Sequence, residues 1–524
     1  MPALDLLIAW PLTSVAASWV LYVILLYTYR LTLHPLAKFP GPRLAAVTFW
    51  FEFYHDYFRG GQYIFRIGDM HAKYGHIVRI SPDELHVNDP SFIPELMPAG
   101  GRRRDKYSRM IQVFGFSQSA GATADHDLHR TRRAAMSKMF SKDSVRRLEP
   151  IMRTNLDKLL VRLKEFQDDG REISLLPMFG AFTNDLISEY AYGLSMNWVQ
   201  APQFNNVFFE MINGFHDLGP FAVQFKWFMP MFAKLPRWLV LKINPGFGAF
   251  GKFKMQLLGN IDKVAKSHNE GKDSKTVFDE ILDSRLSDED KQPLRLLQEA
   301  QTFSIAGTET TSWILSIMTV HLLSNPRVLA KLRTELKTAI PNASEPLSIK
   351  DSEQLPYLSA VVTEGLRIAM GTSQRQTRIN PTDVMTFNDG KKEWHIPPGT
   401  PVAMAAPLIH LNPDVFENPT EFRPERWIEK PHLKRYLMTF SQGSRQCLGM
   451  QLAYGELFLM HSQIWRRFGS KEDHGEDGWW ELFETDRSDV DMASDRFVPY
   501  PKADSKDCLM QTSPLALPCL PQAT

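Results

Sequence analysis

The longest uninterrupted apolar stretch of the chain lies near its N-terminus. Residues 12–29 read LTSVAASWVLYVILLYTY, and no charged residue occurs between Asp5 and Arg30. A helix over this stretch is long enough to cross most of a bilayer, and no polar face interrupts it. A buried core helix is the alternative, but the pattern favours a single transmembrane helix within residues 1–33.

Basic residues follow this apolar stretch and do not precede it. Arg30, His34, Lys38 and Arg43 all lie on its C-terminal side. A cleaved signal peptide normally carries its basic residues ahead of a shorter apolar run. Because positive charge tends to stay on the cytosolic side of a membrane, we expect a retained anchor and a cytosolic body.

Helical periodicity dominates the body, which we predict to span residues 34–503. Prolines in residues 34–43 favour a stiff, extended hinge, and residues 75–88 show short β-like runs broken by turn residues. Helical patterns fill residues 126–370, and an apolar helix over residues 449–468 follows a proline-rich stretch. The predicted fold class is therefore mainly α with small β-sheets.

The C-terminal residues show a different pattern from the body. Residues 504–524 are rich in proline and small polar residues and show no clear periodicity. Such a segment buries too little apolar surface to offset the entropy of ordering it. We predict a disordered tail.

Composition narrows the class of protein. The chain has a net charge of +1, with 44% hydrophobic and 23% charged residues. These are the values of an ordinary globular protein, and they give no reason to expect a nucleic-acid partner. Three cysteines in 524 residues also argue against a disulfide framework.

Only one of the three cysteines, Cys447, lies in the body of the chain. It stands in the segment FSQGSRQCLG, between two glycines and just ahead of the predicted helix 449–468. A buried structural thiol is the common role of a single cysteine. Here the nearby helix N-terminus and glycine turn favour a thiolate, while zinc would need further cysteine or histidine ligands close by.

A second unusual segment lies inside the long predicted helix 294–324. Its centre, residues 306–311, reads AGTETT. The glycine costs about 1 kcal/mol and each threonine about 0.5 kcal/mol relative to alanine, so helix stability does not explain this choice. Threonines tolerated by packing are one explanation, and a helix that crosses a bound planar group is the other.

These segments together resemble the haem-binding and oxygen-activating motifs of the cytochrome P450 family. The signature residues are Phe440, Gly443, Arg445, Cys447 and Gly449. The resemblance covers nearly all of the body and is greatest to fungal secondary-metabolism members similar to trichodiene oxygenase. It implies the cytochrome P450 fold and haem b as cofactor, with Cys447 as the iron ligand.

The resemblance also assigns roles to single residues. Phe440 would pack beside the sulfur, and Arg445 would pair with a haem propionate. Ala306 and Gly307 would leave room for oxygen beside the haem, while Thr310 and Glu309 would form a proton relay.

Two further groups of residues match motifs of the family. Glu364 and Arg367 lie on one helical face, and with Arg426 they would form a structural brace for the cysteine loop. His126 and Arg130 would take the places of a tryptophan and an arginine near a propionate, although the family has tryptophan where this chain has histidine. Arg378 matches another propionate contact.

Electrons must come from a partner, because no P-loop, dinucleotide fingerprint or flavin motif is found. The resemblance implies an NADPH-dependent cytochrome P450 reductase and an endoplasmic reticulum membrane. Its docking surface would be basic, and the cations that fit are Arg132, Lys138, Lys142, Arg146, Arg147, Lys434 and Arg435. Scattered surface charges are the alternative explanation.

An aromatic-rich segment over residues 206–239 favours an apolar small-molecule substrate and contact with membrane lipid. Ile305, Val113 and Phe114 are further pocket candidates. The expected reaction uses O2 to hydroxylate or epoxidise a terpenoid or polyketide. A haem-thiolate isomerase or dehydratase acting on peroxides, and a non-enzymatic haem sensor, are the alternatives.

Overall fold

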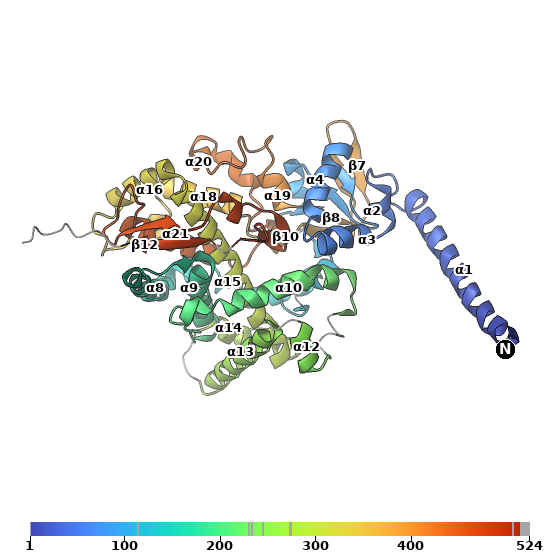
Figure 1. The fold of residues 1–524 in the computed structure, drawn as a ribbon, viewed down its shortest axis with the longest axis horizontal. Coiled ribbons are helices and arrows are strands. Elements are labelled where there is room, and N and C mark those ends of the chain that lie inside the picture. Colours follow the sequence, from blue (N-terminus) through green and yellow to red (C-terminus); the bar gives the residue numbers. More distant parts are fainter. Residues whose placement is uncertain are drawn as a thin grey trace, which may run out of the picture.

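The structure is a computed structural model that describes residues 2–112, 115–228, 231, 234–243, 246–271, 275–505 and 508–513. Most of these residues are helical, and small sheets lie to one side of the helices (Figure 1). The predicted class, mainly α with small β-sheets, is confirmed.

The first helix, α1 (Pro2–Thr32), projects away from the body (Figure 1). Its segment Thr13–Thr32 has a mean hydropathy of 1.4, and none of it is buried against the rest of the protein. Large apolar side chains such as Trp19 and Leu25 are exposed along it. A core helix would be buried, so this helix is suited to a membrane anchor.

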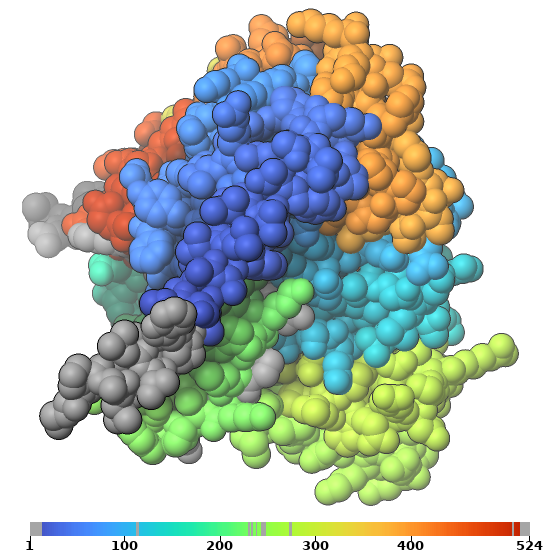
Figure 2. Space-filling view, turned by 90° about the vertical axis from the view of Figure 1, so that its right-hand side faces the viewer, coloured from blue at the N-terminus to red at the C-terminus, as the bar shows by residue number. Residues whose placement is uncertain are grey.

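The side from which α1 projects combines distant parts of the sequence. Figure 2 looks onto this side and shows the blue N-terminal elements beside an orange segment near residue 390, with green helices below. The N-terminal elements are α2 (Arg43–Val47), α3 (Trp50–Phe53), a π-helical turn η1 (Tyr54–Phe58) and α4 (Tyr63–Tyr74).

The largest core lies in the helical part and surrounds α15 (Pro293–Leu323). Proline at its first position and the pair Asn325-Pro326 after it set its ends, as the sequence predicted. It packs most extensively on α9 (Leu175–Tyr192). The other helices of this part are α6 (His126–Ser137), α7 (Lys142–Arg147), α8 (Glu149–Asp169), α10 (Val207–Gln224), α12 (Arg237–Ile243), α13 (Gly246–Asn269), α14 (Val277–Asp283), α16 (Pro326–Ala339), α17 (Ile349–Ser352), α18 (Pro356–Ala369) and α21 (Met450–Arg467).

The main sheet has five strands in the order β1-β2-β8-β5-β3. They are β1 (Ile77–Arg79), β2 (Leu85–Val87), β8 (Pro401–Met404), β5 (Gln376–Ile379) and β3 (Asp105–Lys106). The hairpin of β1 and β2 confirms the small sheet predicted over residues 75–88. The register of β3 and β5 sets Lys106 opposite Arg378, which brings two basic residues from distant segments together.

Smaller elements complete the fold. Two hairpins pair β6 (Met385–Asn388) with β7 (Glu393–Ile396), and β10 (Ser494–Arg496) with β11 (Val498–Tyr500). The remaining short helices are α5 (Ile93–Leu96), α19 (Ala406–His410) and α20 (Arg426–Glu429).

The predicted disordered tail is wrong in part. Residues Leu509–Ser513 form β12, which lies between β4 (Ile173–Ser174) and β9 (Trp479–Leu482). Cys508 and Met510 are buried in the main core. Backbone pairing on both sides and this burial order a segment that is too short to show a clear pattern in the sequence. Residues 514–524 lie outside the described part of the chain.

Candidate active site

Cys447 lies in a loop between a short 3₁₀ turn, η7 (Gly443–Arg445), and the start of α21. Its backbone N–H donates to the carbonyl of Phe440 at 2.8 Å, which closes the loop. Gly443 has φ of +69°, and a Cβ there would lie 2.4 Å from the carbonyl oxygen of Pro98. Only glycine fits this position, so the loop pattern predicted from the sequence has a steric cause.

The Cys447 thiol is accessible to solvent, yet the protein around it is dense. Burial raises the pKa of the thiol, while hydrogen bonds from the backbone N–H groups of Gly449 and Met450 lower it. The charges of Arg133 and Lys106 lower the same pKa. Burial is the largest effect, so the pKa of Cys447 lies above its ordinary value, and the N–H donors and nearby cations that the sequence predicted oppose this rise.

Five nitrogen-bearing side chains, here called the donor cluster, gather near Cys447. They are Lys106, His129, Arg133, Arg378 and Arg445. Burial, with the repulsion of neighbouring cations, lowers the pKa of Lys106 to about 7 and that of Arg378 to about 10. Such a cluster favours an anion with several oxygen acceptors beside the thiol.

The structure places one pair of predicted residues away from the cysteine loop. Arg130 is exposed on α6, and buried His126 accepts a hydrogen bond from the backbone N–H of Arg104. The pair with the same spacing three residues later, His129 and Arg133, faces the cysteine loop, and Arg133 donates to the carbonyl of Gln446 at 2.7 Å.

The physical reason is helix rotation. His and Arg four residues apart occur twice in HDLHRTRR, and the sequence alone does not say which pair faces inward. A shift of three residues turns the side chains by about 60°, enough to move Arg130 out of the cluster.

The two arginines predicted to meet propionates already hold the loop. Arg445 donates to the carbonyls of Thr123 and Ala124, each at 2.7 Å. Arg378 donates to the Ser441 hydroxyl at 3.0 Å. Both side chains are buried and tie the cysteine loop to neighbouring segments, so they position the loop in addition to carrying charge.

Two adjacent residues at the centre of α15 have different surroundings. Ala306 is exposed although the residues before it are buried, so it faces open space inside the fold. A Cβ at Gly307 would instead lie 3.2 Å from the side chain of Ile187 on α9. The glycine lets α15 and α9 pack closely. Helix packing therefore explains the glycine at this position.

The three threonines of this segment also have different roles. Thr308 accepts a hydrogen bond from Asn184 of α9 at 2.8 Å, and Thr311 bonds to Glu456 of α21. Thr310 is half-buried and donates to the carbonyl of Ala306, one turn earlier. Packing therefore explains Thr308 and Thr311, and Thr310 is the one whose hydroxyl lies beside the exposed position 306.

Glu309 is buried beside a residue that the sequence did not single out. Its carboxyl oxygen lies 3.3 Å from Nε2 of His216 on α10. Burial raises the pKa of Glu309 to about 8 and lowers that of His216 to about 3. At neutral pH the pair is therefore a protonated carboxyl beside a neutral imidazole.

The predicted brace is present and fully buried. Arg367 donates to both carboxyl oxygens of Glu364, at 2.8 and 2.9 Å, and Arg426 donates to the same carboxyl at 3.0 Å. Trp427, which the sequence analysis did not assign, adds a fourth hydrogen bond at 2.9 Å. Arg367 also donates to the carbonyl of His410.

His410 connects this brace to the cysteine loop. Its Nδ1 contacts the carbonyl of Arg367 at 2.9 Å, and its Nε2 accepts from the backbone N–H of Met438 at 2.8 Å. Met438 directly precedes the segment that carries Cys447. The brace therefore sets the start of the loop through a buried histidine.

The aromatic-rich segment is only partly buried. Phe208, Phe209 and Phe215 belong to the core, whereas Trp227 and Trp238 are exposed. Of the pocket candidates, Ile305 is buried, while Val113 and Phe114 lie outside the described residues.

Known proteins agree with this site. A sequence model described as Cytochrome P450 matches residues 40–485. The chain belongs to the cytochrome P450 family. Three of its relatives are similar to it along nearly their whole length.

The chain is 40% identical over 509 residues to the cytochrome P450 monooxygenase tpcC of Cochliobolus heterostrophus, covering 96% of this chain and 97% of that protein. It is 38% identical over 484 residues to the tryptophan 6-hydroxylase fscE of Fusarium equiseti, covering 91% and 92%. It is 37% identical over 503 residues to the cytochrome P450 monooxygenase TRI4 of Trichoderma arundinaceum, covering 94% of each. The protein is a haem-thiolate monooxygenase.

The residues present fit the haem iron cofactor that the family implies. One cysteine thiol with backbone N–H donors supplies an axial ligand, and the donor cluster supplies partners for carboxylates beside it. When bound, the haem supplies the redox chemistry that activates O2 for transfer to an organic substrate. A redox partner is needed to deliver the electrons.

Proposed function

We propose that this cytochrome P450 binds haem b through Cys447 and inserts one oxygen atom of O2 into an apolar small molecule of fungal secondary metabolism. The observation that carries the proposal is the accessible Cys447 thiol next to the donor cluster. A structural thiol would have no need of several buried cations around it, because their mutual repulsion destabilises the fold.

Each predicted site residue has a proposed role. Arg133, Arg378 and Arg445, with His129, bind the propionates, and Phe440 and Gly449 shape the loop around the sulfur. Ala306 leaves room for O2. Thr310 and Glu309 hold and move protons at the oxygen-binding side, where Glu309 is neutral at pH 7 because burial raises its pKa to about 8.

The proposed reaction is hydroxylation or epoxidation of a terpenoid or polyketide. Support comes from the exposed position 306 and the aromatic side chains of α10 above the main core. The names of the relatives include a tryptophan 6-hydroxylase as well as TRI4, so an aromatic amino-acid derivative is a second substrate class to test.

The proposed location is the endoplasmic reticulum membrane, with α1 as a single-pass anchor and the body in the cytosol. The exposed apolar surface of Thr13–Thr32 supports contact with membrane lipid. The proposed redox partner is an NADPH-dependent cytochrome P450 reductase. Arg147, Lys434 and Arg435 are exposed and remain candidates for its docking, as does exposed Lys138, which lies 3.8 Å from Glu280, whereas Arg132, Lys142 and Arg146 are paired with carboxylates at shorter distances.

The decisive test is an absorption spectrum of the reduced protein with carbon monoxide, for the wild type and for Cys447→Ser. The wild type should show the red-shifted Soret band of a thiolate ligand, and the variant should lose it. Cys508→Ser, which replaces the other cysteine in the described part of the chain, is the matched control and should keep the band. A wild-type protein without the band would disprove haem-thiolate ligation.

A further inference from the structure

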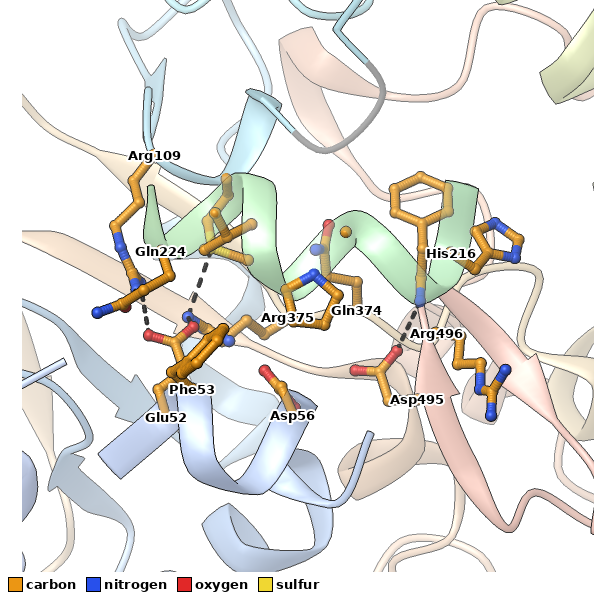
Figure 3. A pocket seen from close by; sticks show the side chains of 15 residues that line it. Glu52, Phe53, Asp56, Arg109, His216, Gln224, Gln374, Arg375, Asp495 and Arg496 are labelled. Carbon is orange, nitrogen blue, oxygen red and sulfur yellow. Dashed lines mark hydrogen bonds and ion pairs between the residues drawn. The ribbon is translucent and has the colours of Figure 1, made fainter. Parts of the chain in front are cut away.

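A polar pocket is lined by His216, the residue that contacts Glu309. It is bordered by η1, α10 and β10, and Figure 3 shows Asp56 and Asp495 between Glu52 at one end and His216 at the other. The volume of the pocket, taken as the space open to the centres of water molecules, is about 50 Å³. Because one water needs about 10–15 Å³ by this measure, it holds a few waters, and a drug-sized ligand needs about 300 Å³ or more.

The side chains along the pocket suit water and protons. At one end the charge of Glu52 is balanced, because Arg109 and Arg375 each bond to its carboxyl at 2.5 Å. Asp495 accepts from the Ser373 hydroxyl at 2.6 Å, and Asp56 accepts from the backbone N–H of Tyr63 at 3.3 Å. Burial raises the pKa of both aspartates, so their protonated forms are favoured more than those of exposed carboxyls.

One residue at the His216 end of the pocket is partly exposed. Arg496 lines the pocket and leaves 31% of its side chain exposed, and it pairs with exposed Asp217 at 2.6 Å. Arg496 therefore contacts both the pocket and solvent.

His216 forms the wall between this pocket and α15. Its Nε2 lies 3.3 Å from Oε1 of Glu309, and its Nδ1 lies 3.5 Å from the hydroxyl of Tyr500. The groups that surround it are Glu309 of α15, Tyr500 of β11, Arg496 and Asp495 of β10, and Asp217 of its own helix. The two ring nitrogens thus have different neighbours, Glu309 at Nε2 and Tyr500 at Nδ1.

We propose that protons for the reaction enter through this pocket and that His216 passes them to Glu309. The idea deepens the proposed function, because it rests on the role of Glu309 in the relay. Once Glu309 has given up its proton, an imidazole that carries its proton at Nε2 gives that proton to the carboxylate and takes one at Nδ1, on the side of Tyr500. The net change is one proton moved inward, and the imidazole must return to its Nε2–H tautomer before the next transfer.

The test measures how the reconstituted holoenzyme and reductase divide O2 between water and hydrogen peroxide, with NADPH and no organic substrate. Reducing O2 to water takes more protons than reducing it to hydrogen peroxide, and it consumes twice as much NADPH. Slow proton entry therefore raises the peroxide share. His216→Phe should slow water formation about tenfold or more, as expected for loss of a positioned proton-transfer group. Glu210→Gln, an exposed change on the same helix, is the matched control and should match the wild type.

A second variant separates proton transfer from positioning. His216→Gln keeps a polar partner for Glu309. An amide, unlike an imidazole, cannot take up a proton at one nitrogen and release another, so this variant should also raise the peroxide share. Normal water formation in His216→Gln would mean that His216 only positions Glu309, and the proposal would be wrong. His216→Gln also keeps the test open if the phenylalanine variant does not fold.

Infrared spectroscopy provides a readout that does not depend on turnover. The difference spectrum of wild type and Glu309→Gln isolates the C=O stretch of the protonated Glu309 carboxyl. His216→Phe should shift this band to higher frequency because it removes a hydrogen-bond partner. An unshifted band would contradict the contact.

The outcomes distinguish the two proposals. If Thr310→Ala and Glu309→Gln raise the peroxide share while both His216 variants do not, the relay stands and this entry route is wrong. If Glu309→Gln leaves the share unchanged, the proposed role of Glu309 falls, and the route through His216 falls with it.

Discussion

Arg367 holds Glu364 in a two-pronged hydrogen bond between groups three residues apart on α18, and neither side chain is exposed to solvent. Water does not compete for this pair, so its geometry depends on protein partners alone. Arg426, Trp427 and the backbone N–H of Arg423 complete the coordination of the same carboxyl. The arrangement connects three segments ahead of the cysteine loop.

Breaking this brace should cost both stability and haem. We expect Arg367→Ala to destabilise the fold by about 3–5 kcal/mol, because it leaves the Glu364 charge buried without its main partner. Thermal unfolding and the amplitude of the carbon monoxide band measure the two effects. Arg423→Ala removes surface ion pairs with Glu429 and Glu417 but keeps the backbone N–H that contacts Glu364, and it should cost less than about 1 kcal/mol. Equal losses in both variants would contradict the brace.

Substitutions on two faces of α6 test the donor cluster. Arg133→Ala should weaken haem retention, since it removes a cation that acts directly on Cys447, and His129→Ala should do the same to a smaller degree. Arg130→Ala, on the exposed face of α6, should retain haem like the wild type. Haem loss to excess apomyoglobin measures all three rates. Faster haem loss from Arg130→Ala than from Arg133→Ala would show that Arg130, as expected from the sequence, is the propionate contact.

The donor cluster also shows how far sequence reasoning reaches. The cysteine loop could be located from the sequence because the spacing of its residues is local, and steric limits such as the one at Gly443 leave a pattern in the sequence. Lys106 left no such pattern. It joins the cluster only because β3 pairs with β5, a contact between segments far apart in the chain.

The same limit applies to His216 and to β12. His216 meets Glu309 only when α10 packs over α15, and a single histidine in an apolar helix gives no signal of that contact. The segment of β12 was predicted as disordered because the C-terminal residues show no clear periodicity and contain several prolines. Its partners β4 and β9, which lie far away in sequence, supply the pairing that orders it.

The threonines of α15 offer a matched pair of variants. Thr310→Ala should release more hydrogen peroxide per NADPH consumed, with product formation falling about tenfold or more, because its hydroxyl lies beside exposed Ala306. Thr308→Ala should instead destabilise the fold by about 1–3 kcal/mol, because it leaves the buried amide of Asn184 without its acceptor. Peroxide assays and thermal unfolding distinguish them. Tightly coupled turnover in Thr310→Ala would remove Thr310 from the relay.

The buried carboxyl of Glu309 should make stability depend on pH. Its pKa is about 8 in the folded protein, because burial disfavours the charged form, and it falls to the ordinary value near 4.5 on unfolding. Between these two values the folded state binds the extra proton, so the free energy of unfolding declines as pH rises, by up to about 1.4 kcal/mol per pH unit. This contribution is fully present below pH 4.5 and is lost as pH rises through 8.

Glu309→Gln removes the group that binds this extra proton in the folded state and keeps a polar group of similar size. The variant should therefore gain stability relative to the wild type as pH rises from 5 to 8, and the two curves should run parallel above about pH 8. Calorimetric midpoints at a series of pH values measure the difference. Glu299→Gln is a useful comparison on the same helix, because Arg295 and the backbone N–H of Ala120 already oppose the effect of burial on that carboxyl. A constant offset between wild type and Glu309→Gln across this range would show that Glu309 is ionised in the folded protein, and the proton donor would then have to be another group.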